Sequence, residues 1–412
     1  MRLTLKTLIY LQTMLKILFK IFPIIDHLYI FQILEYNLWQ FIKWFLKYPF
    51  KRNLQKKHKL EFTAKTKIIF LLIILWILIF YFVTGFWITF LIFIFLSPVF
   101  IFLSHISIFP LEIYYKNKIM DKARQKLAGL PNLKIIAITG SYGKTSTKDI
   151  LYTLLWKKFR VVKTPKSFNT PMGLAQTILD YLKPNTQIFI AELGAYKIGD
   201  IKKLTKFLNP TIGVITAIGP QHLERFGSLE NIAKAKMELF ENLPPGGVAI
   251  RGLNLEAASK VARQLGMSPA EIKERVKWLR PTPHRQEIKK QGSMTIIDNT
   301  YNTNPESAKT SLKLLNDTPG SQKILITPGL VELGKQHNKY NMEFAREGAK
   351  VADTIIIVGE YAKKALLSGL KNFPKEKIHT VTTLNDAMNL LNQIAKPNAV
   401  ILLENDLPDQ YF

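Results

Sequence analysis

The 412-residue sequence contains no cysteine, which excludes disulfide frameworks, thiolate zinc sites and cysteine nucleophiles. Acidic residues are few: 30 Asp and Glu stand against 57 Lys and Arg, a formal net charge of +27, so an acidic partner has to be considered. With 48% hydrophobic and only 21% charged residues, the chain is not of the disordered class. Its length is too great for one ordinary domain and predicts two or three units.

A long uncharged stretch stands out in the first third of the chain. Segment 68–111 contains no Asp, Glu, Lys or Arg. As one helix it would extend about 66 Å at ~1.5 Å per residue, roughly twice the ~30 Å hydrocarbon core of a bilayer. We therefore expect a transmembrane helical hairpin over residues 65–115, with helices at Lys67–Thr84 and Phe86–Phe109 and a break near Gly85. The alternative is a buried hairpin in a large soluble core.

Basic residues flank the uncharged stretch on both sides, and the positive-inside rule then predicts that both of its ends are cytoplasmic. These residues are Lys65, Lys67, Lys116, Lys118, Lys122, Arg124 and Lys126. Much of the excess positive charge is thereby assigned to the membrane. Since no aromatic-basic recognition motif is present either, the sequence predicts no nucleic-acid partner.

Residues 1–64 are apolar but interrupted by charges, which predicts amphipathic helices in the membrane interface rather than further spans. The interrupting charges are Lys6, Lys16, Lys20, Asp26, Glu35, Lys43 and Lys47. A basic cluster follows, expected to lie against anionic lipid headgroups: Lys51, Arg52, Lys56, Lys57 and Lys59. No compact apolar core with a small-residue cleavage site occurs near the start, so a cleavable signal peptide is not expected.

From Lys134 onward, short β-rich runs alternate with helical patterns, the rhythm of a parallel sheet in an α/β fold. The expected strands of a first domain are Lys134–Thr139, Arg160–Lys163, Gln187–Glu192, Thr211–Thr216 and Gly247–Ile250. A charged, proline-containing stretch, Ser268–Pro283, is expected to be a linker. The expected strands of a second domain are Met294–Asp298, Lys323–Thr327, Asp353–Val358, Ile378–Val381 and Val400–Leu403.

A glycine-rich turn between a strand and a helix is the clearest chemical motif. Residues Ile135–Thr147 read IIAITGSYGKTST. Glycines allow backbone N–H groups to approach phosphate oxygens, Lys144 can reach the terminal phosphates, and Thr145 would hold magnesium. The strict Walker spacing places a glycine where Ile138 stands, so the motif here is G-x-x-G-K-T-S. The alternative is a chance glycine turn before a helix.

Three further side chains are candidates for chemistry. Glu192 is expected at the carboxyl end of a strand, where α/β proteins bind ligands and where a carboxylate can complete a magnesium site. His222 follows the next strand, and Lys236 lies in a helical pattern. Taken singly, each has an ordinary alternative: a solvated loop acid, a loop histidine and a solvated helical lysine.

Five segments in this order and spacing closely resemble the Mur ligases of peptidoglycan synthesis: GSYGKTST, AELGA, IGPQHLERFGSLENIAKAKMELF, DNTYNTNPES and ITPGLVELGK. The resemblance covers about Lys134 to Phe412. It implies a parallel-sheet, P-loop-type ATP-binding domain over 132–283 and a smaller Rossmann-like domain over 284–412, which follow the N-terminal membrane helices that the hydropathy predicts. Soluble members of the family carry a UDP-sugar-binding domain where this chain has its membrane segment.

The resemblance also implies site residues. ATP phosphates would be held by Gly140, Ser141, Gly143, Lys144, Thr145 and Ser146, with Arg285 as a further phosphate contact. Glu192, His222 and Thr145 would be magnesium ligands, and Lys236 would be carbamylated and support a second magnesium. Asn299 would contact the ribose and Asn304 the nucleotide base. At Asn299 the chain departs from the family, which has a second acid after the position of Asp298.

Within the family the resemblance is strongest to members that join D-alanyl-D-alanine to a muramoyl tripeptide. It therefore implies an ATP- and magnesium-dependent amide ligase with the muramoyl-peptide precursor and D-alanyl-D-alanine as partners. The uncharged stretch adds the cytoplasmic membrane as its location and membrane lipid as a further partner. Alternatives of the same class are ligation onto a lipid-linked precursor or synthesis of another envelope polymer such as poly-glutamate. A different class is a non-catalytic Mur-like membrane scaffold, which would not require the set of Lys144, Glu192, His222 and Lys236.

Overall fold

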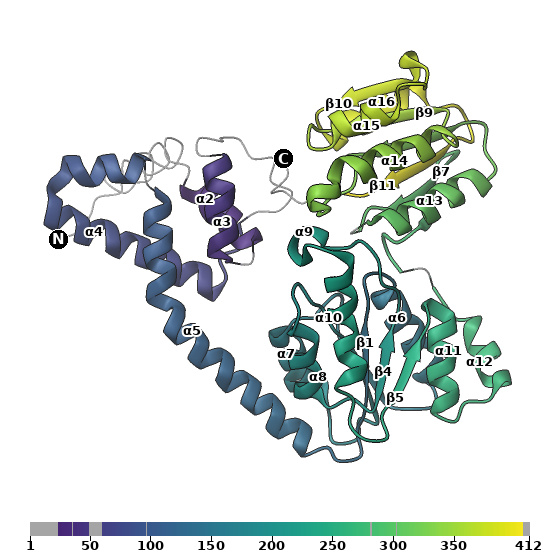
Figure 1. The fold of residues 1–412 in the computed structure, drawn as a ribbon, viewed down its shortest axis with the longest axis horizontal. Helices are drawn as coiled ribbons and strands as arrows, with labels where there is room; N and C mark the ends of the chain where they lie inside the picture. The colour runs from purple at the N-terminus through teal and green to yellow at the C-terminus, as the bar shows by residue number, and fades with distance from the viewer. Residues whose placement is uncertain are drawn as a thin grey trace, which may run out of the picture. The chain divides into compact units, whose positions relative to one another are not determined.

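The structure, a computed structural model, describes residues 24–34, 36–48, 60–95, 97–280, 282–301 and 303–406. The chain divides into two compact units (Figure 1). The first comprises Met1–Lys116 with Leu407–Phe412, and the second comprises Asn117–Asp406.

The first unit is helical. Its helices are α2 (Ile24–Ile33), α3 (Leu38–Lys47), α4 (Ala64–Phe95) and the beginning of α5 (Ser97–Ala128). The helical geometry of α4 is interrupted at Gly85, with φ 79° and ψ 173°, where the sequence predicts a break. The expected second helix, Phe86–Phe109, is wrong in its bounds. Residues 86–95 continue α4 beyond the break, and a separate helix begins at Ser97, because Pro98 fits a first helical turn.

Two helical segments are long and apolar enough to cross a membrane: Ala64–Gly85 and Pro98–Ala128. Only 11% and 22% of their most apolar windows are buried within the protein. Large apolar side chains such as Phe82 and Val83 are instead exposed. This exposure is unlike that of core helices in a soluble protein, which bury their apolar surface.

The segment expected to form interfacial helices is described in part. Helix α2 packs its apolar residues into the core of the first unit, whereas α3 buries Phe41 and Trp44 and exposes Trp39 and Leu46. The expected charges Lys6, Lys16, Lys20 and Glu35 lie outside the described residues, as does the basic cluster Lys51, Arg52, Lys56, Lys57 and Lys59.

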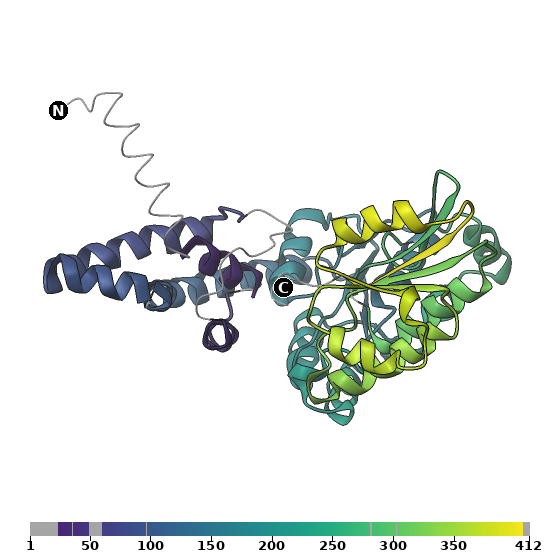
Figure 2. The same cartoon turned by 90° about the horizontal axis from the view of Figure 1, so that it is seen from above.

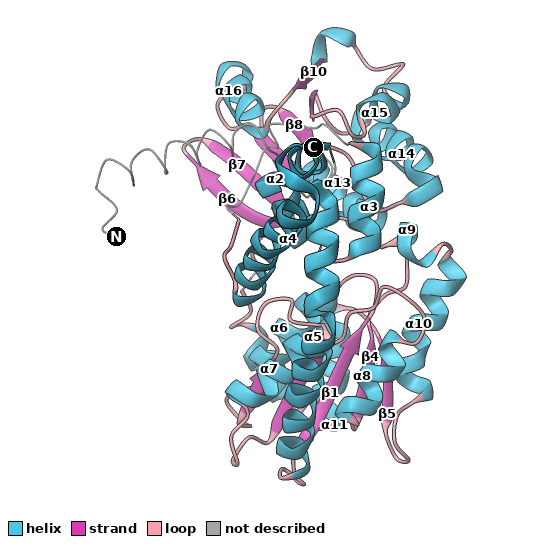
Figure 3. Cartoon of the chain, turned by 90° about the vertical axis from the view of Figure 1, so that its left-hand side faces the viewer, coloured by secondary structure: helices cyan, strands magenta, loops and turns pink. Residues whose placement is uncertain are grey.

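The second unit begins with a five-stranded parallel sheet in the order β2-β3-β1-β4-β5, whose strands Figure 3 draws in magenta. Its strands are β1 (Lys134–Thr139), β2 (Val161–Lys163), β3 (Ile188–Glu192), β4 (Ile212–Ile215) and β5 (Val248–Arg251). The helices are α6 (Lys144–Leu155), α7 (Pro171–Tyr181), α8 (Asp200–Leu208), α9 (Leu223–Phe226), α10 (Leu229–Glu241) and α11 (Asn254–Gln264). Buried clusters on both faces of the sheet make up its core.

A second sheet follows in the order β10-β9-β8-β11-β7-β6. Its strands are β6 (Glu287–Gln291), β7 (Met294–Asn299), β8 (Lys323–Thr327), β9 (Thr354–Val358), β10 (Ile378–Val381) and β11 (Val400–Glu404). Helices α13 (Pro305–Asp317), α14 (His337–Ala349), α15 (Lys363–Gly369) and α16 (Leu384–Ile394) cover its two faces (Figure 2). Two short 3₁₀ turns, Gly334–Gln336 and Lys375–Lys377, complete it.

All ten expected strands are present to within about two residues at each end, and β6 is an addition. It pairs antiparallel with β7 at the edge of the sheet and is largely exposed. The stretch Ser268–Pro283, expected to be a linker, contains a helix in its first half, α12 (Pro269–Val276). Ser268 and Glu271 form a reciprocal capping box there, and Pro269 occupies the first turn. This capping stabilises a helix in spite of the charged and proline-containing composition of the stretch.

Candidate active site

The glycine turn between β1 and α6 adopts a backbone that only glycine accommodates. Gly140 has φ 147° and Gly143 has φ 80°. A Cβ on Gly140 would lie 2.0 Å from Thr216 Oγ1, and one on Gly143 would lie 2.2 Å from Leu253 Cδ1. Both glycines are therefore required by conformation and by space, and the turn leads directly into the N-terminus of α6, a favourable position for phosphate.

Lys144, the first residue of α6, folds back over this turn. Its Nζ donates to the carbonyl oxygens of Gly140 at 2.7 Å and Ser141 at 3.0 Å. Burial lowers its pKa to about 8, although the carboxylate of Glu192 opposes this change. Ser141 in turn donates from Oγ to the carbonyl oxygen of Gly219 at 2.9 Å. The turn is thus held in shape by Lys144 and by the contact of Ser141 with Gly219, which follows β4.

A buried carboxylate lies directly beside the loop. Glu192, at the end of β3, accepts hydrogen bonds through Oε2 from Thr145 Oγ1 and Lys148 Nζ, each at 3.0 Å. Asn169 Nδ2 donates to Oε1 at 3.3 Å. Burial alone would raise the pKa of Glu192, but the charges of Lys148 and Lys144 lower it, so the group is a carboxylate. Ser146, next to Thr145, is partly buried in the same helical turn.

The sequence analysis missed Lys148, whose side chain is almost entirely buried in an ion pair with Glu192. The sequence does contain a pattern that predicts the burial of Lys148. Lys148 falls three and seven residues before Leu151 and Leu155, both of which are fully buried, so it occupies the apolar face of a helix. A lysine at such a position requires a buried acidic partner.

Lys236, on α10, is also buried, with 3% of its surface exposed. Burial is the main cause of a pKa lowered to about 7, and the nearby positive charge of Lys144 adds to it. Within the described part of the chain, no hydrogen bond or ion pair engages its Nζ, which lies 5.7 Å from the centre of the Phe226 ring. An amine with this pKa is substantially neutral, and hence nucleophilic, near neutral pH.

His222 connects the first sheet domain to the second. Its Nδ1 is paired with the carboxylate of Glu332, from the loop after β8. The backbone N–H of Glu224 donates to the carbonyl oxygen of Glu332 at 3.0 Å. Both His222 and Glu332 have left-handed backbones, with φ 53° and 59°. The sequence analysis did not single out Glu332, since a loop acid carries no distinguishing pattern in one sequence.

Arg285 approaches the glycine turn from the start of the second sheet domain. Its Nη2 donates to Thr145 Oγ1 at 3.2 Å, and its guanidinium lies 4.8 Å from the centre of the Tyr301 ring. Burial lowers its pKa, a change opposed by Glu192. Thr145, Glu192 and Arg285, with Lys144 next to Thr145, thus form one site.

Two residues expected to contact the nucleotide are engaged within the protein. Asn304 caps α13, because its Oδ1 accepts from the backbone N–H groups of Glu306 at 3.1 Å and Ser307 at 3.0 Å. Asn299 Nδ2 donates to both carboxylate oxygens of Glu404, at 3.0 and 3.1 Å. Their nucleotide contacts stay predictions, to be made with the atoms that these bonds leave available.

Glu404, which the sequence analysis did not identify, is fully buried at the end of β11. Burial raises its pKa from 4.5 to about 7. The folded chain therefore retains a proton that the unfolded chain releases between these values, and stability should fall by about 3 kcal/mol as pH rises from about 4.5 to 7. We expect Glu404→Gln to remove this slope in denaturant unfolding at pH 5 and 8.

The matched control for this prediction is Glu360→Gln, which neutralises an exposed acid of the same domain and should retain the wild-type slope. Equal pH slopes in wild type and Glu404→Gln would contradict the prediction.

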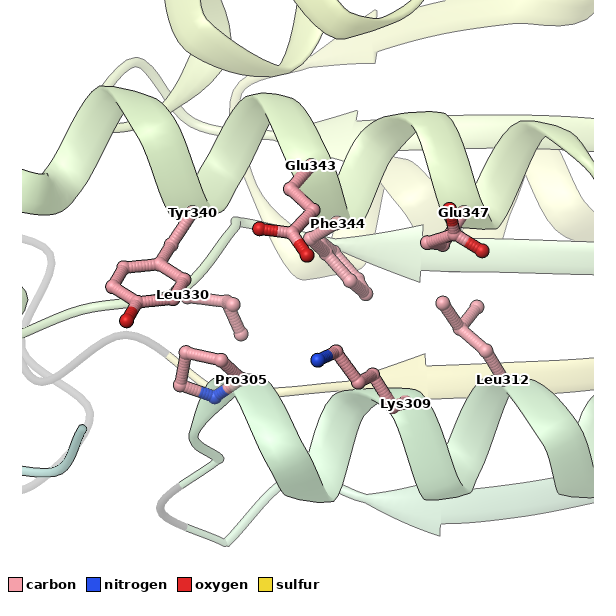
Figure 4. Close-up of a pocket in the computed structure, with 8 residues that line it drawn as sticks. All are labelled: Pro305, Lys309, Leu312, Leu330, Tyr340, Glu343, Phe344 and Glu347. Atoms are coloured by element: carbon pink, nitrogen blue, oxygen red, sulfur yellow. The ribbon is translucent and has the colours of Figure 1, made fainter. Parts of the chain in front are cut away.

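A hollow lies between α13 and α14 (Figure 4). Leu312, Leu330 and Phe344 contribute apolar surface to it, while the side chains of Lys309 and Glu343 face each other across it. Burial raises the pKa of Tyr142 in the glycine turn, and the charge of Glu306 adds to this effect.

Comparison with known families accounts for this arrangement. Residues 138–314 match the Mur ligase middle domain, and residues 284–404 match the Mur ligase glutamate ligase domain. The chain belongs to the Mur ligase family. The UDP-N-acetylmuramoyl-tripeptide–D-alanyl-D-alanine ligase of Bacillus subtilis (strain 168) is 27% identical to this Mur ligase over 335 residues, which cover 66% of this chain and 72% of the relative. The Mycobacterium tuberculosis (strain H37Rv) ligase of the same name is 39% identical over 141 residues, 34% of this chain and 27% of the relative.

Solved structures agree with the fold of this Mur ligase. The MurF ligase of Thermotoga maritima in complex with ADP has a TM-score of 0.63 at 25% identity, covering 71% of this chain and 80% of that one. MurF from Acinetobacter baumannii has a TM-score of 0.65 at 23% identity, covering 72% and 78%.

Proposed function

We propose that this Mur ligase is a membrane-anchored, ATP-dependent amide ligase that joins D-alanyl-D-alanine to a muramoyl tripeptide. The observation that carries the proposal is the single site formed by Lys144, Thr145, Glu192 and Arg285. The buried Lys236 is a further candidate for this site. The relatives of the same name, and the ADP complex of the Thermotoga maritima protein, support the choice of nucleotide and substrates.

The chemistry requires cations fixed in advance. A carboxylate is a poor acyl donor, so ATP phosphorylates it, and the amine of the dipeptide then displaces phosphate through a tetrahedral intermediate. Negative charge grows first on the transferred phosphoryl group and then on the tetrahedral oxygen. Lys144 and Arg285 supply positive charge at the glycine turn, and the backbone N–H groups at the start of α6 add theirs. No nucleophile from the protein is needed.

The oxygen donors beside the turn fit magnesium. Thr145 Oγ1 and Glu192 Oε2 are 3.0 Å apart, and hydroxyl and carboxylate oxygens are the ligands that this ion prefers. Bound there, magnesium would neutralise charge on the phosphates. Lys148 balances the Glu192 carboxylate within the protein and fixes its position. His222 would contribute through Nε2, since its Nδ1 is paired with Glu332.

An unmodified lysine is not a magnesium ligand, so Lys236 fits the second position only after carbamylation. The buried amine, with a pKa lowered to about 7, has the neutral form that attacks carbon dioxide. The product is an anion with two oxygen donors, and it would be held in place by the packing that now encloses the amine.

The membrane assignment rests on the first unit. Lys65, near the start of α4, and Glu112, on α5, form an ion pair at 2.8 Å, and Lys116 joins it at 2.6 Å. The exposed apolar residues lie between these positions in sequence, so the chain would cross the bilayer and return. With both basic flanks on the cytoplasmic side, the catalytic domains are cytoplasmic.

Phosphate release by the detergent-solubilised chain tests the proposal. With ATP and magnesium, release should require both the muramoyl tripeptide and D-alanyl-D-alanine. The control omits either substrate in turn. Turnover only with a polyprenyl-linked muramoyl substrate would replace the proposed acyl donor by its lipid-linked form, whereas no turnover with any wall precursor would favour a scaffold.

A further inference from the structure

The segment that follows β7 contacts the residues around the glycine turn. Tyr301, two residues beyond Asn299, packs against Arg285, which reaches Thr145 of the glycine turn. The Tyr301 hydroxyl donates to Ser167 Oγ of the first sheet domain at 2.9 Å. Asn299, the last residue of β7, lies two positions before Tyr301 at the carboxyl end of the strand, where α/β proteins bind ligands.

Asp298, the neighbouring acid, already has partners for both of its carboxylate oxygens. Oδ2 accepts from Lys289 Nζ at 2.8 Å and pairs with His284 Nδ1 at 2.7 Å. Oδ1 accepts from the hydroxyl of Thr300 at 2.7 Å. Both carboxylate oxygens of Asp298 are thus engaged by residues near the edge of its own sheet. Asn299 is therefore the better candidate to bind a ligand.

Glu404 determines which way the Asn299 amide points. A carboxylate only accepts hydrogen bonds, so the Nδ2 group must face it, and Nδ2 also donates to Ser307 Oγ at 3.3 Å. Ser311 donates to the same carboxylate and anchors it from α13. No hydrogen bond within the described residues engages Asn299 Oδ1. This oxygen is the acceptor that the arrangement leaves available.

We propose that Glu404 is a positioning residue that fixes the Asn299 amide with its oxygen outward, where it accepts a hydrogen bond from a sugar hydroxyl of the bound nucleotide. The amide oxygen of Asn299 would then accept the hydrogen bond in place of a carboxylate, and no negative charge would lie beside the nucleotide. The inference rests on the proposed ATP dependence.

The arrangement has a built-in dependence on protonation. The groups that contact Glu404 are Asn299 from β7, Thr303 from the loop that follows and Ser311 from α13, and all are neutral. Once Glu404 is protonated, one of its oxygens becomes a donor, and the Asn299 amide can rotate to present Nδ2 instead. The preference for a nucleotide that carries the sugar hydroxyl should therefore weaken as pH falls below the Glu404 pKa of about 7.

The experiment measures the Kd of the full detergent-solubilised chain for ATP, 2′-deoxy-ATP and 3′-deoxy-ATP at pH 8 by calorimetry. Wild type should bind ATP about three- to tenfold more tightly than at least one deoxynucleotide, the value of one neutral hydrogen bond. Asn299→Ala and Glu404→Met should each abolish this ratio, and the double variant should lose nothing further. Ser311→Ala is the matched control, because it alters the same carboxylate without releasing Asn299, and it should keep the ratio.

Wild type also provides a test without substitution, which applies if Glu404→Met does not fold. The preference of wild type for ATP over the deoxynucleotide, given as the ratio of the two Kd values, should fall between pH 8 and pH 6. A preserved ratio in Glu404→Met, or in wild type at pH 6, would overturn the positioning role. ATP binding without discrimination against either deoxynucleotide would overturn this inference alone. Failure of wild type to bind ATP at all would overturn the proposed function together with it.

Discussion

Replacing Lys144 by alanine should reduce ATP-dependent phosphate release by about 10³-fold or more. The ammonium group is the cation at the centre of the glycine turn, and its charge is needed most where negative charge develops on the transferred phosphoryl group. Fixed cations at such positions contribute most of the catalysis in phosphoryl transfer, because the enzyme supplies little covalent chemistry. Phosphate release from ATP, muramoyl tripeptide and D-alanyl-D-alanine measures the loss.

Lys157→Ala is the matched control for this variant. It removes the same charge just beyond the other end of α6, where Lys157 Nζ lies 3.5 Å from the centre of the exposed Trp278 ring. Its turnover should equal that of wild type. Retention of more than about a tenth of wild-type turnover by Lys144→Ala would remove the glycine turn from the reaction.

Lys236→Ala is expected to lose about 10²-fold or more of turnover, and short carboxylic acids such as formate and acetate should restore part of it. The alanine variant leaves a space in which a small carboxylate can take the place of the carbamate. The rescue should saturate with carboxylate concentration, as binding to a site does. Measuring phosphate release against acetate concentration gives the size of the effect.

Lys234→Ala provides the comparison on the same helix, since Lys234 is exposed. It should be fully active and insensitive to acetate. An inactive Lys236→Ala that no carboxylate rescues would argue against the carbamate, and a fully active one would remove Lys236 from the site.

The sequence predicts the sheets well because their strands carry strong local signals. Buried β-branched runs such as Lys134–Thr139 and Thr354–Val358 leave few alternatives to a central strand. The edge strand β6 was missed because EIKKQ is polar and exposed, and only its pairing with β7 makes it a strand. The start of α5 depended on a Ser-Pro pair within an apolar run, where hydropathy alone gives no boundary.

The site was predictable where a residue's role follows from its neighbours in sequence. The glycine turn, Lys144 and Thr145 are of this kind. Glu332 and Glu404 are not, because each is defined by a partner more than a hundred positions away, His222 and Asn299 respectively. A single sequence does not show which distant residues meet, and without that information a buried acid in the fold looks like any other acid.

The contact between His222 and Glu332 has a consequence for the timing of the catalytic cycle. Separating the two sheet domains would break it, together with the Glu224–Glu332 backbone bond and the Arg285–Thr145 bond. We expect nucleotide and product to leave through such a separation, so that these contacts would open once in every round. The turnover rate at saturating substrate would then be set by the opening of these contacts. It would depend on solvent viscosity rather than on the chemistry of the leaving group.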